Sequence, residues 1–381
     1  MQVKVFNAID EVPEAWNHLV VHDVLLEYNY LKALEVASPK NITLYYLGVY
    51  KSDHLVGVAV VQHVQLYLKE MFRDRNSHFL KVFFQQCISA VLKGNILVVG
   101  NITHTGQHGF FFDPKKISRD EFQHALLHGI SKIELIVAQQ KKKIRFVMLK
   151  DFFEDTDFVN PDTLKHQKWH RVAVQPNMIM SLSDSWNSNE DYIAAMHKKY
   201  RDRYKRAKKK LNGIICREMD LNDIMINSKQ LYQLYLNVSN QAKFNTFVLP
   251  EQHFYVYKLH LKEHFRVFGY YLNGKLIGFF TLILNYTQLE TYFLGYDSKN
   301  QQTHQLYLNM LYDMAKFGIE HGFKRIVYAR TAMAIKSSVG AKPIPMLLYV
   351  KHKNQLLNAV LKPLFRFMKP AADWEERHPF K

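Results

Sequence analysis

Apolar residues recur along this chain with two periods, one helical and one extended, and together they predict alternating helices and strands. In the first half, the pattern predicts helices and strands at 16–37, 42–50, 55–66, 95–99, 119–141 and 144–149, with a mixed helical region before 95. In the second half, it predicts elements at 171–182, 190–211, 213–217, 220–243, 265–272, 276–285, 289–296, 303–321, 325–328 and 346–351. Helices interleaved with hairpins indicate an α/β fold, a mixed and mostly antiparallel sheet flanked by helices.

An internal repeat divides this pattern into two lobes. Residues 48–62, GVYKSDHLVGVAVVQ, match residues 269–283, GYYLNGKLIGFFTLI, at a constant offset of 221 that aligns Gly48 with Gly269, Tyr50 with Tyr271, Leu55 with Leu276 and Gly57 with Gly278. Each copy is strand, tight polar turn and strand, which is a hairpin signal. A segment rich in Asp, Asn and Pro, 151–168, lies between the copies. We therefore predict two tandem lobes, 1–160 and 161–381, from duplication of an α/β unit.

A strongly basic helix is predicted at 190–211. Ser188 and Asp191 form a start signal, Asn212-Gly213 ends the helix, and the apolar residues form one stripe. The other faces carry nine cations against a lone Asp202, and six of them are our candidates for contacting a polyanion: Lys198, Arg201, Lys205, Arg206, Lys208 and Lys209. A solvated face without a partner is the alternative. If there is a partner, we expect tRNA, a phospholipid or a nucleotide-linked substrate.

Composition adds an electrostatic preference. The chain has 51 Lys and Arg against 34 Asp and Glu, a net charge of +17, which favours polyanionic partners. At 48% hydrophobic residues, wholesale disorder is excluded. The N-terminus lacks the apolar region of a signal peptide, and the longest apolar run, 276–284, is too short to span a bilayer. We expect a cytoplasmic protein, or one peripheral at the inner face of the membrane. The C-terminal stretch 354–369, apolar on one side with cations between, is expected to dock on the second lobe, and an anionic bilayer is the alternative.

One strand and the helix after it suggest a site. In 289–296, alternation places Glu290, Tyr292, Leu294 and Tyr296 on one face. A polar turn then leads into a helix expected to begin at Thr303, whose free amides would favour an anion. Any β-turn-α unit offers such a helix end, so an ordinary core strand and cap is the alternative.

The second half resembles the GNAT acyltransferase superfamily, in which paired strands and a long strand precede a helix facing the donor's phosphates. Two such units in tandem, the second with a basic helix like KKYRDRYKRAKKKL, look like FemAB-like transferases and related bacterial acyltransferases. The segment YARTAMAIKSSVGAKP, 328–343, is similar to the stretch that follows the fifth strand in that family. The resemblance implies transfer of an acyl or aminoacyl group to an amine.

The resemblance also implies roles for particular residues. The strand 292–295 would offer a backbone N–H to the oxyanion, with Tyr292 in it, and Glu290 or Tyr296 would be the base. Lys336 with Arg330 would supply the cation, and Thr303 and His304 would meet the donor's phosphates. Acetyl-CoA enzymes of the superfamily carry glycines at the helix entry, whereas DSKNQQTHQLY, 297–307, has none.

The expected co-substrate is an acyl-CoA or acetyl-CoA, and the alternative donor is aminoacyl-tRNA, which characterised FemAB-like members use to modify a cell-wall or lipid amine. A non-catalytic protein that binds polyanions or the membrane surface is the second alternative. No metal is expected, because His104, His108 and His124 lack the spacing of a metal motif. The loop GNITHTGQHG, 100–109, is a surface loop or, as the alternative, a substrate loop.

Overall fold

The computed structural model describes residues 1–66, 94–154, 158–241, 245–367 and 374–381, and side chains are described outside 362–367. The mixed helical region predicted before residue 95 falls outside these ranges. The chain forms two compact units. Unit 1 comprises the described parts of 1–174, 242–249 and 345–371, and unit 2 comprises those of 175–241, 250–344 and 372–381.

Unit 1 is a mixed sheet in the order β1-β2-β3-β4-β6-β13, with a short strand, β5, that pairs β3. Its strands are β1 (Gln2–Phe6), β2 (Ile42–Lys51), β3 (His54–Leu66), β4 (Gly94–Val99), β5 (Phe110–Phe112), β6 (Ile144–Phe153) and most of β13 (Lys342–His352). The helices are α1 (Ala15–Leu19), α2 (Tyr28–Val36), α5 (Arg119–Gln139), α6 (Pro161–His166) and α15 (Gln355–Phe367).

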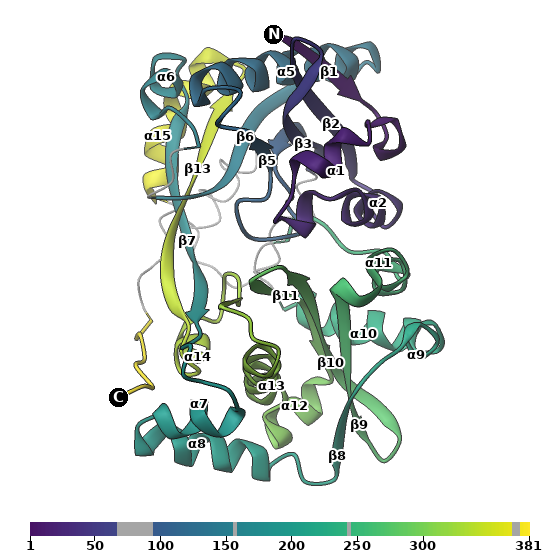
Figure 1. Cartoon of the computed structure of the whole chain (residues 1–381), viewed down its shortest axis with the longest axis vertical. Coiled ribbons are helices and arrows are strands. Elements are labelled where there is room, and N and C mark those ends of the chain that lie inside the picture. Colours follow the sequence, from purple (N-terminus) through teal and green to yellow (C-terminus); the bar gives the residue numbers. More distant parts are fainter. Residues whose placement is uncertain (67–93, 155–157, 242–244, 368–373) are drawn as a thin grey trace, which may run out of the picture. The chain divides into compact units, whose positions relative to one another are not determined.

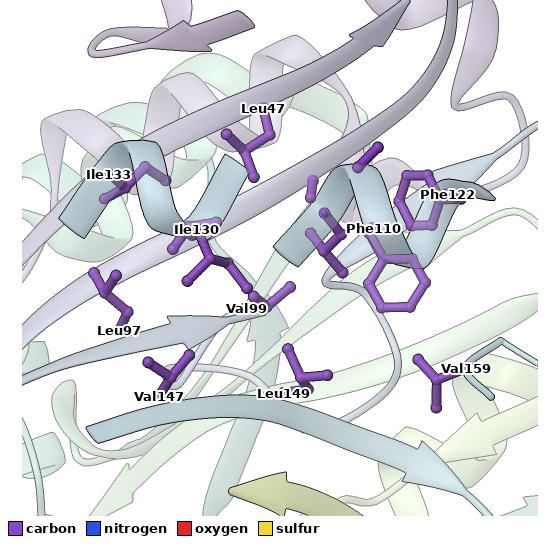
Figure 2. Close-up of a cluster of buried hydrophobic side chains, with 14 of the residues drawn as sticks. Leu47, Leu97, Val99, Phe110, Phe122, Ile130, Ile133, Val147, Leu149 and Val159 are labelled. Atoms are coloured by element: carbon purple, nitrogen blue, oxygen red, sulfur yellow. The ribbon is translucent and has the colours of Figure 1, made fainter. Parts of the chain in front are cut away.

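The core of unit 1 lies between the sheet and α5 (Figure 2). Apolar residues of α5, among them Phe122, Ile130 and Ile133, pack against strand residues such as Leu97 and Val147. A capping box starts the helix: the Ser118 side chain accepts from the Glu121 N–H, and Glu121 accepts in return. Because this box satisfies the first amides of α5, the helix begins where the sequence predicts.

Unit 2 has the strand order β7-β12-β11-β10-β9-β8. Its strands are β7 (His170–Ser181, entering from unit 1), β8 (Ile214–Glu218), β9 (Phe265–Leu272), β10 (Lys275–Asn285), β11 (Gln288–Tyr296) and β12 (Arg325–Val327). Its helices are α7 (Asn189–Ala195), α8 (Lys198–Lys209), α9 (Leu221–Ile226), α10 (Ser228–Ser239), α11 (His253–Leu261), α12 (Ser298–His304), α13 (Leu306–Glu320) and α14 (Met333–Ser337) (Figure 1). Helix α13 packs on one face of the sheet, where Gly318 meets Ile326 and Leu289, and α10 packs on the other, against Gly295.

Four helices predicted as continuous are broken. The helix predicted at 16–37 is two helices, α1 and α2, with a short 3₁₀ helix at Val24–Leu26 between them. The basic helix predicted at 190–211 is two helices, α7 and α8, because Met196 is extended and the His197 N–H bonds the Pro379 carbonyl instead of continuing the helix. The helix predicted at 220–243 divides at Asn227 into α9 and α10. The helix expected from Thr303 begins only at Leu306, after α12, because Gln305 is left-handed with φ 50°.

The C-terminal stretch also differs from expectation. Residues 345–371 group with unit 1, so the prediction that 354–369 docks on the second lobe is wrong. The Asn358 side chain anchors α15 there, accepting from the His352 N–H and donating to the Lys168 carbonyl. In the described part of the chain, no helix is long and apolar enough to cross a bilayer.

The repeat holds at the level of strand register. In unit 1, Val49 pairs Gly57 and Tyr50 pairs Leu55, which leaves Val56 as a bulge. In unit 2, Tyr270 pairs Gly278 and Tyr271 pairs Leu276, which leaves Ile277 as a bulge at the same offset of 221. The carbonyl of each bulge residue accepts from an Asp N–H, that of Asp113 in unit 1 and that of Asp297 in unit 2. The two units therefore repeat one backbone design.

The repeat explains why glycine, tyrosine and leucine coincide in the two sequences. A Cβ on Gly48 would meet the Tyr50 ring at 3.0 Å and a Leu55 methyl at 3.2 Å. A Cβ on Gly269 would meet the matching Tyr271 ring at 2.8 Å and Leu276 methyl at 2.9 Å. In both units, the ring and the methyl group cover the glycine, and a side chain there would displace them.

The units differ four residues further along the hairpin. In unit 2, Leu282 pairs Thr291 and Phe280 pairs Leu294, so two residues of β11 lie opposite Thr281. In unit 1, Val61 pairs Val99 and Ala59 pairs Phe110, so the whole of 100–109 is looped out opposite Val60. The loop GNITHTGQHG is thus an insertion at the position of the β11 bulge.

We expect Gly295→Ala to destabilise unit 2 severely. Its Cβ would lie 2.4 Å from the Leu234 carbonyl carbon and 2.5 Å from the Tyr235 nitrogen, both backbone atoms of α10. Overpacking of this kind costs about 3 kcal/mol, which corresponds to roughly 6–12 °C in melting temperature. Gly278→Ala is the control, because its nearest neighbour is the flexible end of Met310. Equal melting temperatures for the two variants would contradict the packing of α10 on β11.

Candidate functional site

The sheet of unit 2 opens between β11 and β12. Their parallel pairing covers Gln288–Glu290 on β11 and Arg325–Val327 on β12. Beyond that point β11 stays on β10, whereas the continuation of β12 stays on β7, where the Tyr328 N–H donates to the Met178 carbonyl. The two strands therefore follow different neighbours, and the backbone of 291–296 borders the opening.

The bulge in β11 changes which side chains share a face. Leu294 and Tyr296 pack with Leu289 in the cluster that includes α13. Tyr292 instead has its hydroxyl 3.1 Å from His253 Nε2 of α11 and stacks on Tyr257, with ring centroids 5.4 Å apart. The expectation that 290, 292, 294 and 296 form one face is therefore wrong, because two residues opposite Thr281 reverse the alternation.

Two residues predicted as candidate bases differ in their surroundings. Glu290 is 1% exposed and occupies the last paired position before the strands diverge. Burial raises the pKa of Tyr296, so this phenol keeps its proton at neutral pH. The raised pKa makes Tyr296 a poor proton acceptor, which leaves Glu290 as the candidate base to be tested.

The segment after β12 has a strained backbone. Ala329, Thr331 and Ala332 have φ of 57°, 68° and 47°, which residues other than glycine rarely adopt. Lys336, from α14, donates to the Arg330 carbonyl at 2.6 Å and to the Ala329 carbonyl at 3.2 Å. These carbonyls take two of its three N–H bonds, so Lys336 holds the segment that carries Arg330 in place.

Lys336 is itself buried, at 5% exposure. Burial lowers the pKa of its amine to about 7, because the charged form loses hydration. At neutral pH, this amine therefore exists in both protonation states. Lys336 lies in the segment 328–343, which is similar to the stretch after the fifth strand in the GNAT family, and it could exchange a proton near pH 7.

The amino end of α12 is already occupied. Asp297 caps it, and its carboxylate accepts from the N–H groups of Lys299 and Asn300. The Thr303 hydroxyl bonds back to the Lys299 carbonyl, and His304 Nδ1 lies 2.7 Å from the Lys210 carbonyl. Because α12 precedes α13, Thr303 and His304 belong to the end of one helix and not to the start of the donor helix that the sequence predicts.

A basic cavity lies beside the start of α13. It has a volume of about 470 Å³ and is lined by Gln305, which precedes α13, by Leu308 of α13, by Tyr200, and by five cations: Lys199, Arg203, Arg206, Lys210 and Arg377. No carboxylate is among the described residues that line it. The positive end of the α13 dipole adds to the field of these cations. The cavity is therefore suited to a ligand with several negative charges.

Helix α8 has three faces, and they explain which predicted cations meet the cavity. Tyr200, Tyr204 and Ala207 face the core, and Lys199, Arg203, Arg206 and Lys210 repeat at helical spacing along the cavity. Of the six predicted polyanion contacts, Arg206 alone lines the cavity. Of the remaining five, Lys208 pairs with Asp313, and Arg201 donates to the Met196 carbonyl. The other three are exposed and do not line the cavity: Lys198, Lys205 and Lys209.

The residues 374–381 connect α8 with α14, a contact that the sequence did not reveal. The Pro379 carbonyl accepts from His197 at the start of α8, and the Arg377 N–H donates to the Ser337 hydroxyl beside Lys336. The Phe380 ring packs where a Cβ on Gly340 would be, 2.5 Å away. This segment thereby brings Arg377 to the cavity and secures the helix of Lys336.

In unit 1, the loop 100–109 is bound to the end of β6. Lys150 donates to the His104 carbonyl and pairs with the buried Asp151, which also accepts from the Gly106 N–H at 3.1 Å. His104 and His108 have ring centroids 5.5 Å apart, whereas the His124 ring bonds its own helix at Asp120. Within unit 1, the loop therefore occupies the position that is equivalent to the point in unit 2 where β11 and β12 stop pairing.

Solved structures share this architecture over nearly the whole chain. The crystal structure of FemX has a TM-score of 0.58 at 12% identity and covers 95% of this chain and 100% of FemX. A tandem GNAT protein from the clavulanic acid biosynthesis pathway, solved without AcCoA, has a TM-score of 0.53 at 9% identity and covers 93% and 99% of the two chains. No protein-family model and no curated protein sequence matches the chain. The predicted fold, two tandem GNAT-like lobes with a mixed sheet flanked by helices, is confirmed.

We expect Lys336 to make stability depend on pH. Its pKa is about 7 in the folded state and near 10.5 in the unfolded chain, so the unfolded state binds more protons between these values. The free energy of unfolding therefore gains from this group as pH rises from 7 towards 10. The melting temperature of the wild type minus that of Lys336→Met should therefore increase as pH rises over this range. Lys342→Met, at an exposed lysine of the same unit, should follow the wild type. A gap that stays constant from pH 7 to 9 would show that Lys336 is not desolvated.

Proposed function

We propose that this chain is an N-acyltransferase that moves an acyl or aminoacyl group from a phosphate-bearing donor, bound by unit 2, to an amine. The supporting observation is the basic cavity at the start of α13, on the helix that follows the open edge of β11. In this proposal the donor's phosphates occupy the cavity and its acyl end lies at that edge. The likeness to FemX and to a tandem GNAT protein agrees with this chemistry at the level of the fold.

The donor that fits best is the aminoacylated end of a tRNA. Asp297 holds the amides at the start of α12, so a diphosphate approaching them would meet a carboxylate, and no glycine in 297–307 lets it approach the backbone closely. The cavity itself offers five cations and the ring of Tyr200, the combination that binds single-stranded nucleic acid. An acyl-CoA, the donor expected from the sequence, becomes the second candidate, because its nucleotide carries fewer phosphates than a tRNA.

The chemistry needs three groups. The acceptor amine attacks the donor carbonyl and a tetrahedral oxyanion forms. Its collapse breaks the ester or thioester bond, and the proton lost by the amine is passed to the departing ribose oxygen or thiolate. Backbone N–H groups of 291–296 at the open edge would stabilise the oxyanion. Glu290, at the point where the strands diverge, would take the proton of the amine, and Lys336 would hold the segment that presents Arg330.

Unit 1 would serve the acceptor. Its loop 100–109, fixed to Asp151 and Lys150, occupies the place equivalent to the open edge in unit 2. A donor therefore has no equivalent edge to approach in unit 1. We infer that unit 1 is the copy without transfer activity and that its surface contributes to acceptor recognition.

We expect bulk tRNA to bind through the cavity face of α8. The variant Lys199→Ala/Arg203→Ala/Arg206→Ala should weaken binding at least about tenfold and lower the dependence of log K on log salt by about 2, since three phosphate contacts are lost. The matched variant Lys198→Ala/Lys205→Ala/Lys209→Ala removes the same charge from the exposed face of the same helix. Filter binding at several salt concentrations measures both.

Two results would redirect this proposal. Equal losses in the two variants would mean that α8 attracts RNA by net charge alone, as a non-catalytic polyanion-binding protein would. A thermal shift with CoA, acetyl-CoA or a long-chain acyl-CoA, and none with tRNA, would make acyl-CoA the donor; a ligand at 100 times its Kd adds about 2.7 kcal/mol.

We expect Glu290→Gln to slow transfer by about 10²–10⁴-fold, because the isosteric amide cannot accept a proton. The measurement is single-turnover loss of label from aminoacylated tRNA, with lysine and glucosamine supplied as probe amines. Tyr296→Phe should stay within about threefold of wild type, since the raised pKa of Tyr296 keeps its hydroxyl protonated. A larger loss in Tyr296→Phe than in Glu290→Gln would assign the proton transfer to the tyrosine.

A further inference from the structure

Unit 1 has a large cavity that the transfer chemistry does not use. Its volume is about 960 Å³, and it lies among α6, the first residues of β7, β13 and α15. The walls combine aromatic rings with cations: Trp169, Tyr349, Lys165, Lys168 and Arg171. Asp162 is the acidic residue among the described residues of the lining, so the cavity is net positive.

The indole of Trp169 points to a ligand. Trp169 is 7% exposed, and in the described part of the chain its Nε1–H has no hydrogen-bond acceptor, although it lines the cavity. The Nε2 atom of the neighbouring His170 is also buried without a partner among the described residues. A buried donor without an acceptor costs free energy, and buried polar groups are nearly always bonded. An oxygen atom of a bound anion would satisfy the indole.

The mouth of this cavity carries an outward apolar stripe. Leu356, Ala359 and Val360 recur at helical spacing on α15, and Leu356 is 81% exposed. The opposite side of α15 is fixed to unit 1, because Asn358 bonds His352 and Lys168 and Leu361 is fully buried. The stripe therefore faces away from the core of the unit, next to Lys165 and Lys168.

We propose that this face binds the surface of a membrane containing anionic phospholipid. The headgroup phosphate enters the cavity, accepts from the Trp169 N–H, and is surrounded by Lys165, Lys168 and Arg171, the last of which also pairs with Glu154. Leu356 and Val360 enter the border of the acyl chains. An apolar stripe flanked by cations is the arrangement by which helices lie in an anionic interface. This binding is independent of the transfer chemistry of unit 2.

The test is sedimentation of the full chain with vesicles of 30% phosphatidylglycerol in phosphatidylcholine, and with pure phosphatidylcholine. We expect binding to the anionic vesicles that is weakened at high salt, and at least about tenfold weaker binding for Leu356→Asp and for Lys165→Glu/Lys168→Glu. Controls of equal charge change, Ile226→Asp and Lys40→Glu/Lys115→Glu, lie at exposed positions elsewhere and should bind as the wild type does. Trp169→Phe, which keeps an aromatic ring and loses the N–H, should weaken binding about tenfold.

Several outcomes would overturn the proposal. Equal binding to the two kinds of vesicle, or no binding to either, would show that anionic lipid is not the ligand of this face. Losses as large in the controls would show that net charge alone governs binding. If instead charge reversal at Lys205 and Lys209 abolishes binding while Lys165→Glu/Lys168→Glu leaves it intact, the membrane contact is the basic helix. If Leu356→Asp abolishes self-association in sedimentation velocity without affecting vesicles, the stripe binds a second copy of this chain.

Discussion

The site depends on what happens where two parallel strands stop pairing. A strand that loses its neighbour exposes backbone N–H and C=O groups, and those groups must find other partners. In unit 1, β4 and β6 pair as far as Val99 and Leu149, and the inserted loop 100–109 then bonds the end of β6. In unit 2, β11 and β12 separate after Glu290 and Val327, and the bulge supplies only Tyr292 and Phe293. One duplicated backbone thus carries the ten-residue loop 100–109 at this point in one copy and a two-residue bulge in the other.

Packing also determines where the positive charge of unit 2 is concentrated. Helix α8 presents tyrosines and Ala207 to the core, and this orientation turns Lys199, Arg203 and Arg206 toward the start of α13. Concentrating like charges costs self-repulsion, which an anionic ligand would offset. On another face of α8, Lys208 is neutralised by Asp313 of α13. The described lining of the cavity, in contrast, contains no carboxylate. The same segment that delivers Arg377 to the cavity also bonds Ser337, so the positions of Arg377 and Lys336 are mechanically linked.

The sequence predicts the elements governed by local chemistry and misses those set by distant contacts. The hairpins, the repeat and the fold class follow from turn residues and alternation, and the registers confirm them. The break at Met196 depends on Pro379 and Phe380, which are distant in sequence, so helical periodicity alone predicts a continuous helix. The reversal of faces in β11 depends on two residues sharing one partner, which an alternating pattern does not show. Packing between distant segments also decides which cations line the cavity. From the sequence we therefore chose mostly other cations of α8 and did not include Arg203 or Arg377.

The most direct test of this account is hydrogen exchange along the two equivalent strands, followed by mass spectrometry with and without aminoacylated tRNA. If unit 2 holds the donor at its open edge, the amides of 291–296 and of α8 should become protected, and those of β4, its counterpart in unit 1, should not change. Protection of β4 and the loop 100–109 instead, or no change at 291–296 when the RNA is bound, would contradict it.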